Sequence, residues 1–164
     1  MKKKLSLSAR YLLLLLSFSL HEVHADSDVK FHGSLVVIQC QVNEDKAVNV
    51  QFGSVGVNKV NGVNFTMPIP FAVTCNNLGG EANPGLTLRV NGTQSDFNEA
   101  AVVTDVDGLA IKIMKDGEDL KLNTDTEITF SPQTVLTAAP VKKDGVDLVA
   151  GTFHATATLV VNVA

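Results

Sequence analysis

Segments that favour tight turns recur at short intervals along the chain, and most of them are Asn-Gly or Asp-Gly pairs. These are Asn61-Gly62, residues 76–80, Asn91-Gly92, Asp107-Gly108, Asp116-Gly117 and Asp144-Gly145. Between them lie short runs of strand-forming residues, of which the clearest are 48–52, 71–74, 86–90, 109–114 and 127–130. No stretch of helical periodicity exceeds about two turns, and residues 96–102 are a candidate for a single helical turn. Short strands separated by regular turn signals predict an all-β sandwich.

The beginning of the chain has the character of a secretory signal peptide. A basic stretch over residues 2–10 precedes an apolar run over residues 11–20, which is too short to span a bilayer. Val23-His24-Ala25 then supplies a small-x-small cleavage pattern. Removal of 25 residues from the 164 leaves 139, the length of one domain.

The expected mature chain is acidic. Cleavage takes away four of the 13 basic residues and one of the 17 acidic ones, which leaves a net charge of −7. A negatively charged exported domain is poorly suited to binding nucleic acid or anionic lipid, because both repel it. We therefore predict no nucleic-acid partner.

Two cysteines, Cys40 and Cys75, fall in the expected mature chain. In an exported protein an even count most simply predicts one disulfide. Closing a loop of roughly 35 residues would stabilise the fold by about 3–4 kcal/mol. The chain contains no Cys-x-x-Cys motif, so we favour a structural bridge over a redox site.

No motif in the expected mature chain indicates catalysis. His32 and His154 are its only histidines, and neither belongs to a known metal-ligand or hydrolase pattern. The acidic residues near the turns lack the spacing of a calcium-binding loop and are interpreted as solvated: Asp105, Asp107, Asp116, Glu118 and Asp119. We predict a protein that is not an enzyme and has no catalytic residue, cofactor, metal site or small-molecule substrate.

From residue 29 to residue 37 the odd positions are apolar or glycine, and the even positions begin with three polar residues. Lys30, His32 and Ser34 occupy one face, and the other face carries Val29, Phe31, Gly33, Leu35 and Val37. Gly33 interrupts the apolar face, and a glycine in a strand often marks the close approach of another backbone or a bulge. A first strand of the domain's own sheet remains an open interpretation of this segment.

A second alternation follows Gly151 and continues to the end of the chain. The other residues of its first face are Phe153, Ala155, Ala157, Leu159, Val161 and Val163. A regular strand of this length exceeds the usual five or six residues, and at a sheet edge it would template pairing with other chains. The pattern therefore indicates that a partner pairs with this strand.

These two segments resemble the ends of chaperone–usher pilus subunits. Residues 27–35, Ser-Asp-Val-Lys-Phe-His-Gly-Ser-Leu, followed by Cys40, are similar to their N-terminal extension. Residues 151–161, Gly-Thr-Phe-His-Ala-Thr-Ala-Thr-Leu-Val-Val, are similar to their C-terminal strand. One departure is Val163, because these subunits usually carry an aromatic residue next to last.

The resemblance implies an immunoglobulin-like β-sandwich that lacks its last strand and is completed by donor-strand complementation. Residues 1–25 would be the signal peptide, 26–37 the donor-strand extension and 38–164 the pilin domain. The donor strand to a neighbouring subunit would be Val29, Phe31, Gly33, Leu35 and Val37. The groove-edge strand that meets the chaperone would contain Gly151, Phe153, Ala155, Ala157, Leu159, Val161 and Val163.

The resemblance also implies partners and a location. The expected partners are a periplasmic pilus chaperone, an outer-membrane usher and other pilus subunits, and the expected destination is a fimbrium at the cell surface. The amino-acid sequence of the extension most resembles that of a minor or adaptor subunit of the P-pilus type. A self-contained secreted β-sandwich that binds carbohydrate or another ligand is the alternative, and it would fold alone as a stable monomer.

Overall fold

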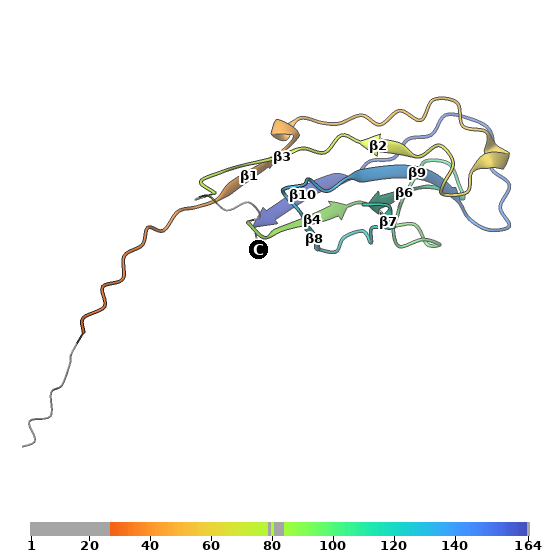
Figure 1. Ribbon diagram of the computed structural model, residues 1–164. Helices are drawn as coiled ribbons and strands as arrows, with labels where there is room; N and C mark the ends of the chain where they lie inside the picture. The colour runs from red at the N-terminus through yellow and green to blue at the C-terminus, as the bar shows by residue number, and fades with distance from the viewer. Residues whose placement is uncertain (1–26, 79, 81–83, 164) are drawn as a thin grey trace, which may run out of the picture. The chain divides into compact units, whose positions relative to one another are not determined.

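The structure is a computed structural model that describes residues 27–78, 80 and 84–163 (Figure 1). The chain divides into two units, Met1–Ser34 and Leu35–Ala164. The expected signal peptide, residues 1–25, lies outside the described residues. Within the described part of the chain, no helix is long and apolar enough to cross a membrane.

The described residues of the second unit fold into short antiparallel strands (Figure 1). The strands are β1 (Gln39–Val42), β2 (Met67–Ile69), β3 (Val73–Asn76), β4 (Leu86–Asn91), β5 (Ala101–Val103), β6 (Leu109–Lys115), β7 (Glu118–Asp119), β8 (Thr126–Ile128), β9 (Leu136–Lys142) and β10 (Thr158–Val163). Two single 3-10 turns, η1 (Asn43–Asp45) and η2 (Val57–Lys59), accompany them. The all-β prediction is confirmed.

The strands form three antiparallel sheets. One sheet has the order β2-β9-β6-β5, with β7 paired to β6; a second has the order β10-β4-β8; the third is the pair β1-β3. Buried residues of the first two sheets form one core, since Leu88 and Val90 of β4 cluster with Ile111 and Ile113 of β6 and with Leu136 of β9. The sheets therefore bury a common apolar face, as a sandwich does.

The burial in β4 follows directly from its sequence. Leu86, Leu88 and Val90 are buried, while Thr87 and Arg89 between them are partly exposed. Successive side chains of a strand point to opposite faces, so this alternation places one face in the core and the other toward water.

Two predicted turns have the backbone that their residues favour. Asp116 and Gly117 both have positive φ, 51° and 89°, and connect β6 to β7. Gly108 has a φ of 72°, and a Cβ there would come within 2.6 Å of Val146 Cγ1. Both the positive φ and the contact with Val146 exclude a larger residue at this position.

The strand β9 is not among the runs that the sequence pattern singled out, because Pro140 lies inside it. Pro140 is opposite Ile111 of β6, and β2 pairs with β9 only from Leu136 to Ala138. The missing N–H therefore costs no ladder bond to β2, and the Pro140 carbonyl accepts a hydrogen bond from Gly62 N at 2.9 Å.

Two local predictions are wrong. Residues 96–102 form no helical turn: the Ser95 side chain bonds Asn98, a turn follows, and Ala101–Val103 becomes β5. Pairing of β5 with β6 buries Ala101 and Val102, which outweighs a weak helical preference. Residues 48–52 form no strand, although Phe52 still packs against the core.

Candidate functional site

Within the described part of the chain, β10 pairs along one edge, with β4. Its register with β4 runs from Thr158 opposite Asn91 to Val163 opposite Leu86. Among the described residues no strand pairs with its second edge, and β1, which comes close to it, pairs only with β3. An edge of this kind offers backbone N–H and C=O groups to an additional strand.

The predicted long C-terminal strand is wrong in its first half. β10 begins at Thr158, and residues 152–157 have no ladder partner among the described residues. Of the predicted groove-edge side chains, Phe153, Leu159 and Val161 pack against the core while staying partly exposed. The others are exposed: Gly151, Ala155, Ala157 and Val163.

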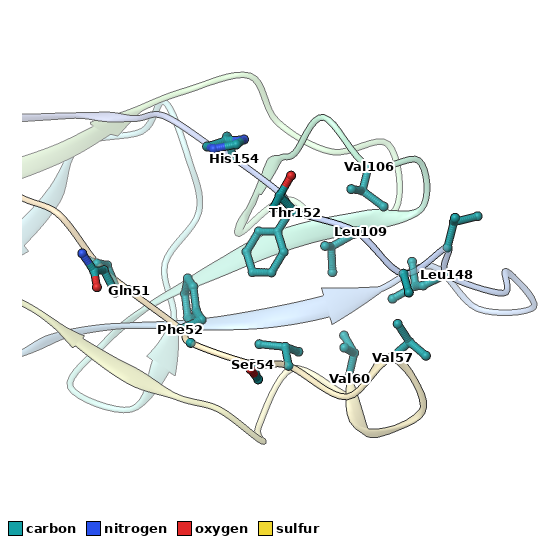
Figure 2. A pocket seen from close by; sticks show the side chains of 17 residues that line it. Gln51, Phe52, Ser54, Val57, Val60, Val106, Leu109, Leu148, Thr152 and His154 are labelled. Atoms are coloured by element: carbon teal, nitrogen blue, oxygen red, sulfur yellow. The ribbon is translucent and has the colours of Figure 1, made fainter.

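A cavity of about 560 Å³ lies beside the start of this segment, between residues 50–57 and 148–154 (Figure 2). Its lining combines apolar side chains, such as Val60, Val106 and Leu109, with polar ones, such as Gln51 and Thr152. The Phe52 and Phe153 rings meet there with centroids 5.9 Å apart and planes tilted by 42°. A concave space of this size, with two aromatic rings in its wall, can accept a large apolar side chain.

His154 and Asp105 are joined at the rim of this cavity. Asp105 Oδ1 accepts a hydrogen bond from His154 N at 2.7 Å, and Asp105 Oδ2 lies 3.0 Å from His154 Nδ1. Asp105 N in turn donates to the His154 carbonyl at 3.2 Å. The hydrogen bond from His154 N, followed by that from the His154 side chain, holds the pKa of Asp105 below its usual value.

The predicted donor residues are exposed. Phe31 is 90% exposed and Leu35 fully so, and Val29 and Val37 are also largely open to solvent. A Cβ added at Gly33 would meet nothing within 4 Å. The described residues 27–38 form no strand.

Cys40 and Cys75 form the disulfide expected from the sequence. They stand directly opposite each other in the ladder between β1 and β3. The bridge therefore fixes the first strand of the domain immediately after the exposed extension.

The acidic residues of the turns are dispersed. Asp116 accepts a hydrogen bond from Val135 N, Asp119 pairs with Lys112 at 2.9 Å, and Asp105 binds His154. The described residues contain no group of three or more ligands that could hold a metal ion.

Two parts of this site were not predicted from the sequence. One is the cavity wall from Val50 to Val55, whose alternating Val50 and Phe52 were interpreted as a strand. The other is Asp105, which sequence reasoning assigned to a solvated turn. No local signal connects Asp105 with His154, because 49 positions separate them along the chain.

Comparison with known proteins agrees with this architecture. The model of the family described as "Fimbrial protein" matches residues 29–164. The uncharacterized fimbrial-like protein YfcQ of Escherichia coli is 35% identical over 139 residues, covering 82% of this chain and 86% of that protein. A second E. coli protein, the uncharacterized fimbrial-like protein YfcR, is 31% identical and covers 71% of this chain and 70% of its own.

Solved structures share the fold. The P pilus rod subunit PapA superposes with a TM-score of 0.61 at 17% identity, covering 85% of this chain and all of that chain. The P pilus adaptor subunit PapF gives a TM-score of 0.55 at 19% identity, covering 76% and 95%. Both likenesses bear on the fold, which is that of pilus subunits.

The chain belongs to the fimbrial protein family, as its resemblance to chaperone–usher pilus subunits implied. It is a fimbrial subunit. Membership in a family of structural subunits also supports the prediction that the protein is not an enzyme.

Proposed function

We propose that this fimbrial subunit assembles by donor-strand exchange, as acceptor through β10 and as donor through residues 26–37. The observation that carries the proposal is a pair of complementary features in one chain. β10 has an edge with no strand partner among the described residues, and the segment before it borders a cavity with many apolar side chains. The extension carries an exposed apolar face. In this proposal the sandwich of residues 38–164 lacks its last strand.

The energetics favour the insertion of a donor strand. Burying three or four side chains such as Val29, Phe31, Leu35 and Val37 would contribute roughly 5–10 kcal/mol before entropy costs. Backbone hydrogen bonds to the free edge of β10 would add to this and fix the register. The partly exposed Phe153, Leu159 and Val161 would become buried under the inserted strand.

Gly33 determines how closely the donor strand can approach the groove of the acceptor subunit. It interrupts the apolar face of the extension with hydrogen in place of a side chain. In the assembled fibre the backbone at Gly33 would lie against the groove where it is shallowest. A larger side chain there would hold the donor away from the edge of β10.

Three partners follow from this mechanism. A periplasmic chaperone would supply a temporary strand along residues 153–163. An outer-membrane usher would then receive the subunit, and the extension of the next subunit would replace the chaperone strand. The residues 1–25 would direct export, and the fibre would end at the cell surface.

Within the fimbrium we place this chain as a minor or adaptor subunit. The support is the amino-acid sequence of the extension over residues 27–35. Counting subunits in isolated fibres by quantitative mass spectrometry tests the assignment. A copy number comparable to that of the rod subunit would overturn it.

The central test measures uptake of a donor peptide. The mature chain is unfolded with its disulfide intact and refolded in the presence of a fluorescein-labelled peptide of residues 26–37. Fluorescence anisotropy and size-exclusion chromatography then report a stable one-to-one complex. Refolding without peptide should leave a chain that is unstable or self-associated.

Two peptides with the same new side chain sharpen this test. Gly33→Leu should abolish stable uptake, because it adds bulk on the apolar face. His32→Leu makes the neighbouring residue equally bulky on the opposite face and should leave uptake within about threefold of the unmodified peptide. Equal uptake of both peptides, or a stable monomer that ignores every peptide, would overturn the proposal.

A further inference from the structure

The segment that follows Gly151 is held in place without ladder pairing. Residues 152–157 precede β10 and have no strand partner among the described residues. Asp105 makes three contacts to this segment, all with one residue: its carboxylate binds His154 N and His154 Nδ1, and its own N–H binds the His154 carbonyl. These contacts, which we call the Asp105 clamp, do here what a β-ladder does along β10.

The clamp also sets the direction in which the side chain of the preceding residue, Phe153, points. His154 lies at the rim of the cavity (Figure 2), with 78% of its side chain exposed. Phe153 is partly buried against the core. Neighbouring side chains of an extended chain point to opposite sides, so fastening His154 outward aims Phe153 inward. Phe153 then meets Phe52 across the cavity, with ring centroids 5.9 Å apart.

The clamp joins two walls of the same cavity. Val106, the residue after Asp105, and Leu109 line one side, and Phe153 and His154 line another. Thr104 braces the turn from within, because its hydroxyl bonds the carbonyls of Val106 and Leu109 and accepts from Val106 N. Asp105 therefore projects from a braced turn onto a segment that has no ladder partner among the described residues.

We propose that Asp105 is a positioning residue of the acceptor site, which fixes His154 and thereby sets the place of Phe153 in the cavity that receives a donor side chain. The inference rests on the proposed function, since it assigns a role within that acceptor site. Asp105 touches no donor residue itself and acts through the segment that it holds. The lowered pKa of Asp105 agrees with a carboxylate that is kept charged for this purpose.

The experiment follows dissociation of the labelled peptide of residues 26–37 from the refolded mature chain, chased with unlabelled peptide. Asp105→Ala removes the acceptor oxygens and should speed dissociation about fivefold to tenfold. Asp105→Asn keeps an acceptor oxygen for His154 N and should stay within about threefold of the unsubstituted chain. Asp107→Ala, an exposed carboxylate in the same turn, is the matched control and should leave the rate unchanged.

A double-mutant cycle separates positioning from a general loss of stability. Phe153→Ala removes the side chain that the clamp aims, so adding Asp105→Ala to it should change the peptide dissociation rate by less than about twofold. A purely structural role of Asp105 would instead give independent effects that multiply. Multiplying effects, or an Asp105→Ala rate equal to that of Asp107→Ala, would overturn the inference while leaving the proposed function intact. Failure of the unsubstituted chain to take up any peptide would overturn both.

Discussion

Two regions of this chain have a similar alternating pattern but differ in how far their apolar side chains are buried. In β10 and the segment before it, Phe153, Leu159 and Val161 pack against the core. In residues 29–37 the equivalent apolar face is exposed, with Phe31 at 90%. The difference lies in the surroundings: β10 has β4 as a neighbour and a core beneath it, whereas the described extension has no strand partner. Alternation therefore specifies a strand that can be buried on one face, and the burial itself depends on a partner.

The largest contrast should come from placing a charge in each region. Leu159→Asp puts a carboxylate against the core and should cost several kcal/mol, enough to abolish recovery of folded protein from the periplasm. Leu35→Asp places the same charge on a fully exposed side chain and should leave folding unchanged while preventing donation. Western blots of periplasmic extracts measure the first effect. Equal yields of the two variants would contradict the distinction between the regions.

The disulfide lies at the start of the domain, in the first strand after residues 29–37. Cys40→Ser combined with Cys75→Ser should lower the free energy of unfolding by about 3–4 kcal/mol, because the unfolded chain regains the freedom of a closed loop. Urea titration followed by circular dichroism, carried out on the peptide-bound chain, measures the loss. The reduced unsubstituted chain is the control and should show a similar decrease; a loss below about 1 kcal/mol would count against a stabilising bridge.

Truncation of one valine in each region gives a smaller contrast. Val161→Ala removes partly buried methyl groups and should cost about 0.5–1.5 kcal/mol in the same urea titration. Val37→Ala shortens a side chain that is 70% exposed and should change the stability of the domain by less than about 0.5 kcal/mol. The same cost at both positions would show that the extension is packed against its own domain.

The smallest effect concerns pH. Because His154 lowers the pKa of Asp105 in the folded chain, the associated stability is present above the unfolded value of about 3.9 and is lost as pH falls through the folded pKa. The difference in urea midpoint between the unsubstituted chain and Asp105→Ala should therefore shrink from pH 6 down to pH 2.5. A difference that stays constant over this range would contradict the hydrogen-bonded carboxylate.

Much of the fold was predictable from local patterns. The runs at residues 86–90 and 109–114 became β4 and β6, since β-branched and aliphatic residues between turn dipeptides have few other stable arrangements. β9 was missed because a proline normally excludes a paired strand, and only the short extent of β2 allows Pro140 there. The helical turn expected at residues 96–102 gave way to β5 because pairing with β6 buries more apolar surface.

The candidate site was predictable only in part. The sequence indicated both partners of the proposed exchange, since each is a regular alternation near one end of the chain. It did not indicate the cavity, whose walls come from residues 50–57, 106–109 and 148–154. These segments meet only after the sheets have packed, so no window of the sequence contains the information.

The sequence by itself determined that the chain is built of short strands, that its two cysteines pair, and that both ends carry one apolar face. These are properties of neighbouring residues, set by side-chain alternation, turn chemistry and residue count. The tertiary structure decided where β10 begins, which of its edges stays free, and that Asp105 fastens His154 beside the cavity. Those outcomes depend on contacts between residues far apart in the chain, whose energies are fixed by the packing of whole sheets.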